Sequence, residues 1–222
     1  MKTETPTVYI IGGANGVGKT TSFYDLFPIE CPFINADEIS RKLKESTNND
    51  RNIQEIANRE AIHQMNIYLS EKKTFGFESN LADIDTWKFI ERIKIFGYQV
   101  HIIYYGLDDV NICIQRVQHR VKEGGHDVRQ DIIKQRYEQS LPLLKHYLAL
   151  PNTLVLKDSS FVPKECAVLQ EGVIITLIDE LPAWVKNCIT PNIPKQQASA
   201  TEQTSSQVIA LSFPISLPNN NY

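Results

Sequence analysis

The sequence predicts a three-layer α/β fold, in which a mainly parallel five-stranded sheet is flanked by helices. Short apolar runs alternate along the chain with longer amphipathic stretches, which is typical of parallel strands joined by helices. A glycine-rich phosphate-binding motif follows the first apolar run directly, in the strand, loop and helix context that such a motif requires. Two further apolar runs near the end of the ordered part predict a small C-terminal strand addition.

The alternation assigns each element to a segment. Strands are expected at residues 7–11, 32–35, 74–78, 98–105 and 153–157, with the late pair at 166–169 and 173–177. Helices are expected at residues 19–26, 39–45, 52–72, 83–96, 109–122, 129–150 and 178–188.

The helix expected at 52–72 shows an amphipathic pattern. Its periodicity predicts a stripe facing the core that consists of Ile53, Ile56, Ala57, Glu60, Ala61, Gln64 and Ile67. Arg51, Arg59 and His63 are expected to lie exposed beside this stripe. Most of this pattern indicates ordinary packing and not a substrate site.

The glycine-rich segment matches the pattern G-x-x-x-x-G-K-[ST]. Its glycines allow successive backbone N–H groups to turn toward a phosphate, Lys19 adds a positive charge for the β and γ groups, and the Thr20 hydroxyl can hold Mg²⁺. The alternative is a glycine-rich turn with an incidental lysine. The predicted nucleotide-binding residues are Gly13, Ala14, Asn15, Gly16, Val17, Gly18, Lys19, Thr20 and Thr21.

The composition of the chain is that of an ordinary globular protein. It has 222 residues, of which 42% are hydrophobic and 22% charged, and its net charge of −3 argues against general nucleic-acid binding. Its four cysteines are scattered without C-x-x-C spacing, and no secretory signal pattern precedes them, so a cytoplasmic location is expected. No apolar run approaches the roughly 20 residues that cross a bilayer, so no membrane partner is expected.

The composition changes near residue 190. Residues 1–189 are expected to form one domain, whereas residues 190–222 are rich in Pro, Gln, Ser, Thr and Asn. This low-complexity tail lacks the apolar mass that would offset the entropy of ordering, so we expect it to be disordered. Its segment 208–211 could still add an edge strand, here or on a partner.

Polar residues follow the second and third expected strands. Asp37 comes directly after the second strand and is expected at the carboxyl edge of the sheet, where open α/β sheets bind ligands. There it could accept a proton from a substrate hydroxyl, orient that hydroxyl, or hold Mg²⁺ through water. The alternative is an aspartate that merely caps a helix.

Glu78, Ser79 and Asn80 end the third strand at the same edge. Their side chains suit hydrogen bonding to a hydroxylated substrate or to a water bound to Mg²⁺. A strand-to-helix turn built from turn-prone residues is an equally good interpretation of this segment.

Arginines cluster in the segment 116–136. Arg116 and Arg120 fall on one edge of the apolar stripe of the first helix, and Arg129 and Arg136 share a flank of the second. A loop with paired glycines, residues 123–127, joins the two helices. Because guanidinium groups match phosphoryl oxygens well, the segment is predicted to be a helical lid that closes arginines over the γ-phosphate. Solvated helix faces are the alternative.

These segments together resemble the zeta toxin family, in particular its short stand-alone branch. The likeness spans residues 7–160, and it is most specific in the segment Gly124-Gly125-His126-Asp127-Val128, which arginines frame. Two departures are notable: Asn80 stands where a threonine is expected, and the chain is shorter than the large family members.

The resemblance implies a P-loop kinase-like fold that uses ATP and Mg²⁺ to phosphorylate a hydroxyl of a nucleotide-activated sugar, with UDP-N-acetylglucosamine as the family's substrate. It implies a separately encoded antitoxin as a partner. It also implies that Lys19 and Thr20 form the phosphate and magnesium pair. The implied roles of the other residues are catalysis for Asp37, Arg120 and Arg129, substrate binding for Asp37, Glu78, Ser79 and Asn80, and nucleotide contact for Arg116 and Arg136.

Three other functions fit parts of the pattern. A nucleotide-dependent switch would bind or hydrolyse ATP without an acceptor. A polynucleotide or antibiotic kinase would share the phosphate-binding loop and lid, although an oligonucleotide asks for a basic groove that the net charge of −3 does not indicate. An inactive relative is disfavoured because Lys19, Thr20 and Asp37 are all present.

Overall fold

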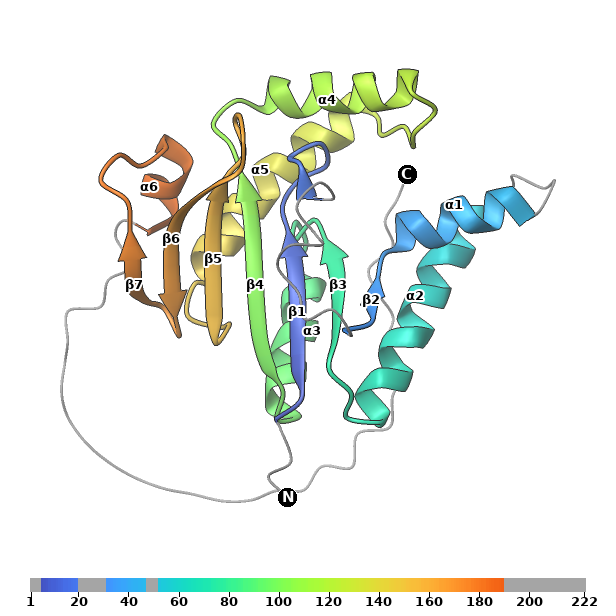
Figure 1. Ribbon diagram of the computed structural model, residues 1–222, viewed down its shortest axis with the longest axis horizontal. Helices are drawn as coiled ribbons and strands as arrows, with labels where there is room; N and C mark the ends of the chain where they lie inside the picture. The colour runs from blue at the N-terminus through green and yellow to red at the C-terminus, as the bar shows by residue number, and fades with distance from the viewer. Residues whose placement is uncertain (1–4, 20–30, 47–51, 190–222) are drawn as a thin grey trace.

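Strands and helices alternate along the chain as predicted (Figure 1). The computed structural model describes residues 5–19, 31–46 and 52–189. Its strands are β1 (Thr7–Gly12), β2 (Phe33–Ile34), β3 (Phe75–Ser79), β4 (Gln99–Gly106), β5 (Thr153–Asp158), β6 (Lys164–Gln170) and β7 (Val173–Leu177). Its helices are α1 (Ala36–Ser46), α2 (Ile53–Ser70), α3 (Ile84–Ile95), α4 (Val110–Lys122), α5 (Gln130–His146) and α6 (Ala183–Ile189).

The seven strands form one sheet in the order β2-β3-β1-β4-β5-β6-β7. The first five are parallel, and β6 and β7 continue the sheet antiparallel. This confirms the mainly parallel five-stranded sheet and its C-terminal addition. The chain leaves β1 for the edge strand β2, returns through β3 on the same side of β1, and then crosses to β4 on the other side. The direction of strand addition therefore reverses at β1. Such a reversal opens a crevice at the carboxyl ends of the strands, where ligands bind in α/β sheets.

Two clusters of buried side chains hold the helices against the sheet. The larger joins β1, β3 and β4 to α3, α5 and α6, and includes a stack of Trp87 on Tyr147 with ring centroids 4.8 Å apart. The smaller joins the phosphate-binding loop, α4 and the start of α5 through Val17, Cys113 and Ile133. Figure 1 shows α4 above the carboxyl edge of the sheet, so this second cluster fixes the loop and the predicted lid to the same platform.

The buried stripe of α2 confirms part of the predicted one. Ile53, Ala57 and Ala61 are buried as predicted, and Met65 joins them. Ile56 and Ile67 are instead 49% and 40% exposed, and Glu60 is also exposed. Because α2 packs on α1 and on the short edge strand β2, a narrow row of mostly small residues is sufficient to seal it. The expected exposure of Arg59 and His63 is confirmed.

Some expectations concern residues outside the described ranges. Apart from Lys19, the helix expected at 19–26 lies there, as do Arg51 and the tail at 190–222. Within the ranges that are described, no helix has the length and apolarity that a bilayer crossing needs.

Candidate active site

The phosphate-binding loop begins where β1 ends. Gly13, Gly16 and Gly18 have φ angles of +129°, +78° and +99°, a region that side chains other than glycine rarely adopt. The N–H of Val17 donates to the carbonyl of Ala14 at 3.3 Å and closes the turn between them. The loop therefore has the positive-φ backbone that turns N–H groups toward an anion.

Two of these glycines touch neighbouring main chain. A Cβ atom on Gly13 would lie 2.3 Å from the carbonyl oxygen of Tyr105 in β4, and one on Gly16 would lie 2.3 Å from that of Cys113 in α4. Such overlaps cannot be relieved by a side-chain rotation. The shape of the loop is thus set by backbone contacts with β4 and α4.

Gly16→Ala is expected to destabilise the protein by about 2–5 kcal/mol, from the left-handed backbone and the overlap with Cys113 together. Nucleotide binding should be lost with it. Gly124→Ala is the matched control, because Gly124 has a φ of +83° but no atom within 4 Å of its added Cβ, so only about 1–2 kcal/mol is expected. Denaturant unfolding measures both, and equal losses would contradict the steric account.

Lys19 lies beneath this loop and is only 5% exposed. Its ammonium donates to the carbonyls of Gly13 at 2.6 Å and Ala14 at 3.0 Å, and to Asn80 Oδ1 at 3.3 Å. Glu78 Oε1 lies 3.5 Å away as its ion-pair partner. The lysine therefore connects the loop to Glu78 and Asn80, two of the three polar residues predicted at the end of β3.

Burial lowers the pKa of Lys19, and the carboxylates of Glu78 and Asp37 oppose that shift. The opposing effect places Asp37 within electrostatic reach of the lysine. A positive charge that is held under the loop and partly stripped of water is a strong potential partner for phosphate oxygens.

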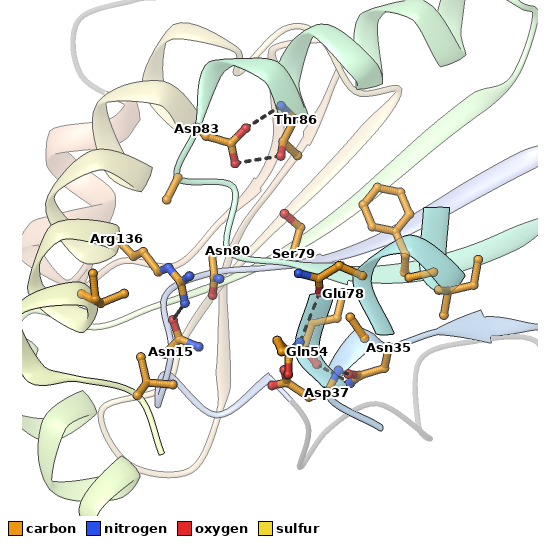
Figure 2. A pocket seen from close by; sticks show the side chains of 18 of the residues that line it. Asn15, Asn35, Asp37, Gln54, Glu78, Ser79, Asn80, Asp83, Thr86 and Arg136 are labelled. Atoms are coloured by element: carbon orange, nitrogen blue, oxygen red, sulfur yellow. Dashed lines mark hydrogen bonds between the residues drawn. The ribbon is translucent and has the colours of Figure 1, made fainter. Parts of the chain in front are cut away.

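Asn35, and not Asp37, caps helix α1. Its Oδ1 accepts from the backbone N–H groups of Asp37 at 2.9 Å and Glu38 at 3.2 Å, and its Nδ2 donates to Glu78 Oε2 at 3.0 Å. The alternative that Asp37 caps the helix is therefore wrong. The exposed carboxylate of Asp37 lies at the rim of a pocket, beside Asn35 and Gln54 (Figure 2).

The polar residues at the end of β3 make two kinds of contact. Glu78 bridges Lys19 and Asn35, and Asn80 also accepts from Lys19. Ser79 Oγ instead accepts from the backbone N–H of Leu81 at 3.1 Å, at a residue with a φ of +51°. Turn formation thus accounts for Ser79, whereas Glu78 and Asn80 face the lysine.

A pocket of about 430 Å³ opens next to these residues, within the range of small-molecule sites. It brings together Asn15 of the loop, Asp37, the end of β3 and Arg136 of the predicted lid (Figure 2). The other lining residues come mainly from α2, α3 and α5: Ile34, Asn35, Ala36, Gln54, Asn58, Ala61, Met65, Phe77, Ala82, Asp83, Thr86, Phe89, His126, Val128, Ile132, Gln135 and Gln139.

Sequence reasoning missed the amide residues of this pocket, Gln54 and Asn58 on α2 and Gln135 and Gln139 on α5. Those on α2 continue the row that ends in Ala61 and Met65, so a correct buried stripe would have pointed to them. Asp83 was also missed as a lining residue; both its oxygens accept from Thr86, at 2.7 and 2.8 Å, which caps α3.

The structure brings two of the four predicted arginines to the phosphate-binding loop. Arg136 donates to Asn15 Oδ1 at 2.8 Å (Figure 2). Arg116 donates to the carbonyls of Ser159 at 2.8 Å and Ser160 at 3.2 Å, and reaches the carbonyl of Val17 at 3.5 Å.

The other two arginines make local contacts within the lid. Arg120 donates to the carbonyl of His126 at 2.8 Å and packs against Gly125, so it shapes the glycine loop. Arg129 is exposed and pairs with Asp131. In this conformation, neither guanidinium lines the pocket.

Thr20 and Thr21 lie outside the described residues. Thr20 is the predicted magnesium ligand, so the structure does not describe that position. Residues 5–19, 31–46 and 52–189 contain no cluster of three or more His, Cys, Asp or Glu that could hold a metal alone. The residues present fit a nucleotide whose metal is held mainly by phosphate and hydroxyl oxygens: a glycine cradle, a buried lysine below it, and the carboxylates of Asp37 and Glu78 beside it.

The fold and the loop define the class: this is a P-loop kinase fold. A structure of the AvrRxo1-ORF1:ORF2 complex with ATP superposes with a TM-score of 0.67 at 12% identity, covering 87% of this chain and 66% of that one. A structure of the PezAT chromosomal toxin–antitoxin system of Streptococcus pneumoniae gives 0.51 at 15% identity, covering 73% and 72%. The chain thus spans slightly less than two thirds of the AvrRxo1 chain. The predicted P-loop kinase-like fold is confirmed.

Sequence comparison places the chain in a family. An uncharacterized protein of Haemophilus influenzae is 34% identical over 128 residues, which are 56% of this chain and 88% of that protein. The chain belongs to the same family as this protein. No family model matches the sequence.

Proposed function

We propose that the protein is a kinase that transfers the γ-phosphoryl group of ATP to a hydroxyl of a small molecule, with Mg²⁺. One observation carries the proposal: the buried lysine of the phosphate-binding loop contacts Glu78 and Asn80, and these two residues also line a pocket that has Asp37 at its rim. A phosphate cradle and an acceptor-sized cavity therefore meet at one edge of the sheet. Phosphoryl transfer needs this juxtaposition above all, because its catalysis is mostly positioning and electrostatics.

On the nucleotide side, the loop and Lys19 hold the β and γ phosphates, and Thr20 takes the magnesium position of the motif. Bound magnesium supplies charge neutralisation on those phosphates. Arg136 approaches the loop through Asn15 and Arg116 through Val17, so both can stabilise charge that develops in the transition state. Arg120 and Arg129 reach the phosphates only if the lid changes conformation.

On the acceptor side, Asp37 accepts the proton of the substrate hydroxyl or orients it for attack. Asn35 fixes the start of α1, and with it the backbone of Asp37. The Glu78 carboxylate accepts a hydrogen bond from Asn35 and forms an ion pair with Lys19. It therefore connects the acceptor side of the site to the nucleotide side. This arrangement positions the acceptor against the cradle.

The finer assignment follows from the resemblance to the zeta toxins. The acceptor is proposed to be a nucleotide-activated sugar such as UDP-N-acetylglucosamine, and the protein to be the cytoplasmic toxin of a toxin–antitoxin pair. A structure of a toxin–antitoxin system, PezAT, is among those sharing the fold. A pocket of this size beside the phosphate-binding loop favours an enzyme with an acceptor over a pure ATPase switch, and its acidic rim does not suit a polynucleotide.

The proposal is tested by incubating the full chain with γ-labelled ATP, Mg²⁺ and a panel of nucleotide sugars, free sugars, nucleosides and oligonucleotides. Label is expected in one hydroxyl of a sugar-containing product, located by mass spectrometry. ATP hydrolysis with no labelled acceptor would instead support the nucleotide switch. Label on oligonucleotide ends would support the polynucleotide kinase.

A further inference from the structure

The charges that line the acceptor pocket are mostly negative. Asp37, Glu78 and Asp83 contribute carboxylates, and Arg136 is the one lysine or arginine among the described lining residues. That arginine is engaged with Asn15 of the phosphate-binding loop. Glu78 is paired with Lys19 at 3.5 Å, so the carboxylates of Asp37 and Asp83 are the ones that would repel a phosphate or carboxylate in the pocket.

Apart from His126, the remaining polar side chains of the pocket are amides and hydroxyls. Gln54 and Asn58 of α2 and Gln135 and Gln139 of α5 place amides on two separate helices around the cavity. The buried rings of Phe77 and Phe89, with centroids 6.2 Å apart, supply apolar surface. Amides and an apolar surface together suit an uncharged ring that carries hydroxyl groups.

Gln54 contributes a buried acceptor whose hydrogen-bonding capacity is not used within the described residues. Its Nε2 donates to Asn58 Oδ1 at 3.2 Å, whereas its Oε1 is buried and finds no hydrogen-bond partner in the part of the chain that the structure describes. A buried amide oxygen without a donor is costly, and such groups in native proteins call for an explanation. Because Gln54 lines the pocket beside Asp37, a hydroxyl of the bound acceptor can supply the donor.

We propose that the pocket receives an uncharged, hydroxyl-bearing ring, and that Gln54 Oε1 accepts a hydrogen bond from one hydroxyl of that ring. The inference rests on the proposed kinase function and defines its acceptor. Any phosphate that the acceptor carries, including the diphosphate of a nucleotide sugar, extends out of this pocket and not into it. Gln54 is a specificity-determining residue, and Asp37 keeps the catalytic role.

The first experiment compares matched sugars as acceptors for the full chain. The probes are N-acetylglucosamine with its 6-phosphate, glucose with glucose 6-phosphate, ribose with ribose 5-phosphate, and UDP-N-acetylglucosamine. We expect the uncharged member of a pair to be phosphorylated with a kcat/KM at least tenfold above that of its phosphate ester. A phosphate ester that equals or exceeds its uncharged partner would overturn the inference while leaving the kinase function in place. If none of these sugars is phosphorylated, and none of the nucleosides and oligonucleotides of the first panel is phosphorylated either, the kinase function itself would be contradicted.

The second experiment uses Gln54→Met, which keeps the side-chain length and removes the amide. We expect the acceptor KM of the best probe to rise about 3–10-fold, the range of one neutral hydrogen bond, with kcat and the KM for ATP nearly unchanged. The melting temperature should change little, because the loss of the hydrogen bond to Asn58 is offset by removal of the unpartnered buried oxygen. Gln64→Met is the matched control on the same helix, since Gln64 donates to Glu60 at 2.9 Å and lies outside the pocket.

Deoxy analogues of the best probe complete the test. One deoxy analogue lacks the hydroxyl that Gln54 contacts. The wild type is expected to bind this analogue more weakly than the parent compound, whereas Gln54→Met should bind the two equally well. An unchanged acceptor KM in Gln54→Met, or equal losses in Gln54→Met and Gln64→Met, would show that Gln54 does not read the acceptor.

Discussion

Replacing Asp37 with asparagine is expected to lower the rate of acceptor phosphorylation by about 10²–10⁴-fold, the usual contribution of a positioned general base. Asparagine keeps the shape of the side chain and removes the charge and the basicity. Because Asn35 supplies the cap of α1, the fold should not depend on the Asp37 carboxylate. The checks are kcat with the best acceptor, circular dichroism, and ATP binding by calorimetry.

Glu38→Gln is the control for this variant. Glu38 is the next residue in the first turn of α1, and its exposed carboxylate pairs with Lys42 at 2.8 Å, away from the lysine of the loop. It should therefore retain wild-type activity. If Asp37→Asn forms product at the normal rate, Asp37 has no part in the chemistry, and the acceptor must be activated by another group.

Lys19→Met is expected to remove nucleotide binding and to lower kcat by at least about 10²-fold, the scale seen when one preorganised charge-stabilising donor is lost. Methionine fills a similar volume, so no cavity should open where the buried lysine lay. Differential scanning fluorimetry gives the readout. At an ATP concentration of 100 Kd the wild type should gain about 2.7 kcal/mol of stability, and the variant should gain none.

Lys42→Met serves as the matched substitution at an exposed lysine, on the outer surface of α1. It should leave nucleotide-induced stabilisation unchanged. Full stabilisation of Lys19→Met by ATP would mean that the nucleotide binds elsewhere, and the phosphate-binding role of the loop would have to be abandoned.

The sequence was sufficient for those parts of the site that depend on local order along the chain. The phosphate-binding loop is contiguous, and its glycine spacing reflects backbone torsions that few other residues allow. Asp37 and Glu78 could be placed because the carboxyl ends of neighbouring parallel strands meet at one edge of a sheet. Both predictions use geometry that is independent of side-chain packing.

The rest depends on how helices rotate about their axes once they are packed. Gln54 lines the pocket because α2 buries the row that contains Ile53 and Ala57. The predicted stripe also included Ile56, so it was centred on a different face of the helix and did not indicate Gln54. The arginines show the same limit. The predicted helix gave Arg129 and Arg136 one common flank. In the structure Arg129 is the N-cap residue that precedes α5 and pairs with Asp131, whereas Arg136 lies within the helix and reaches the loop.

The contacts that shape the phosphate-binding loop are made by the carbonyls of Tyr105 and Cys113, and not by their side chains. Replacing either side chain changes the packing nearby but leaves the oxygen that limits the loop where it is. Substitutions at these two positions can therefore accumulate without altering the phosphate-binding loop, provided that Gly13 and Gly16 are kept. Divergent sequences can in this way keep the same loop, while the acceptor pocket, which is built from side chains, changes its specificity.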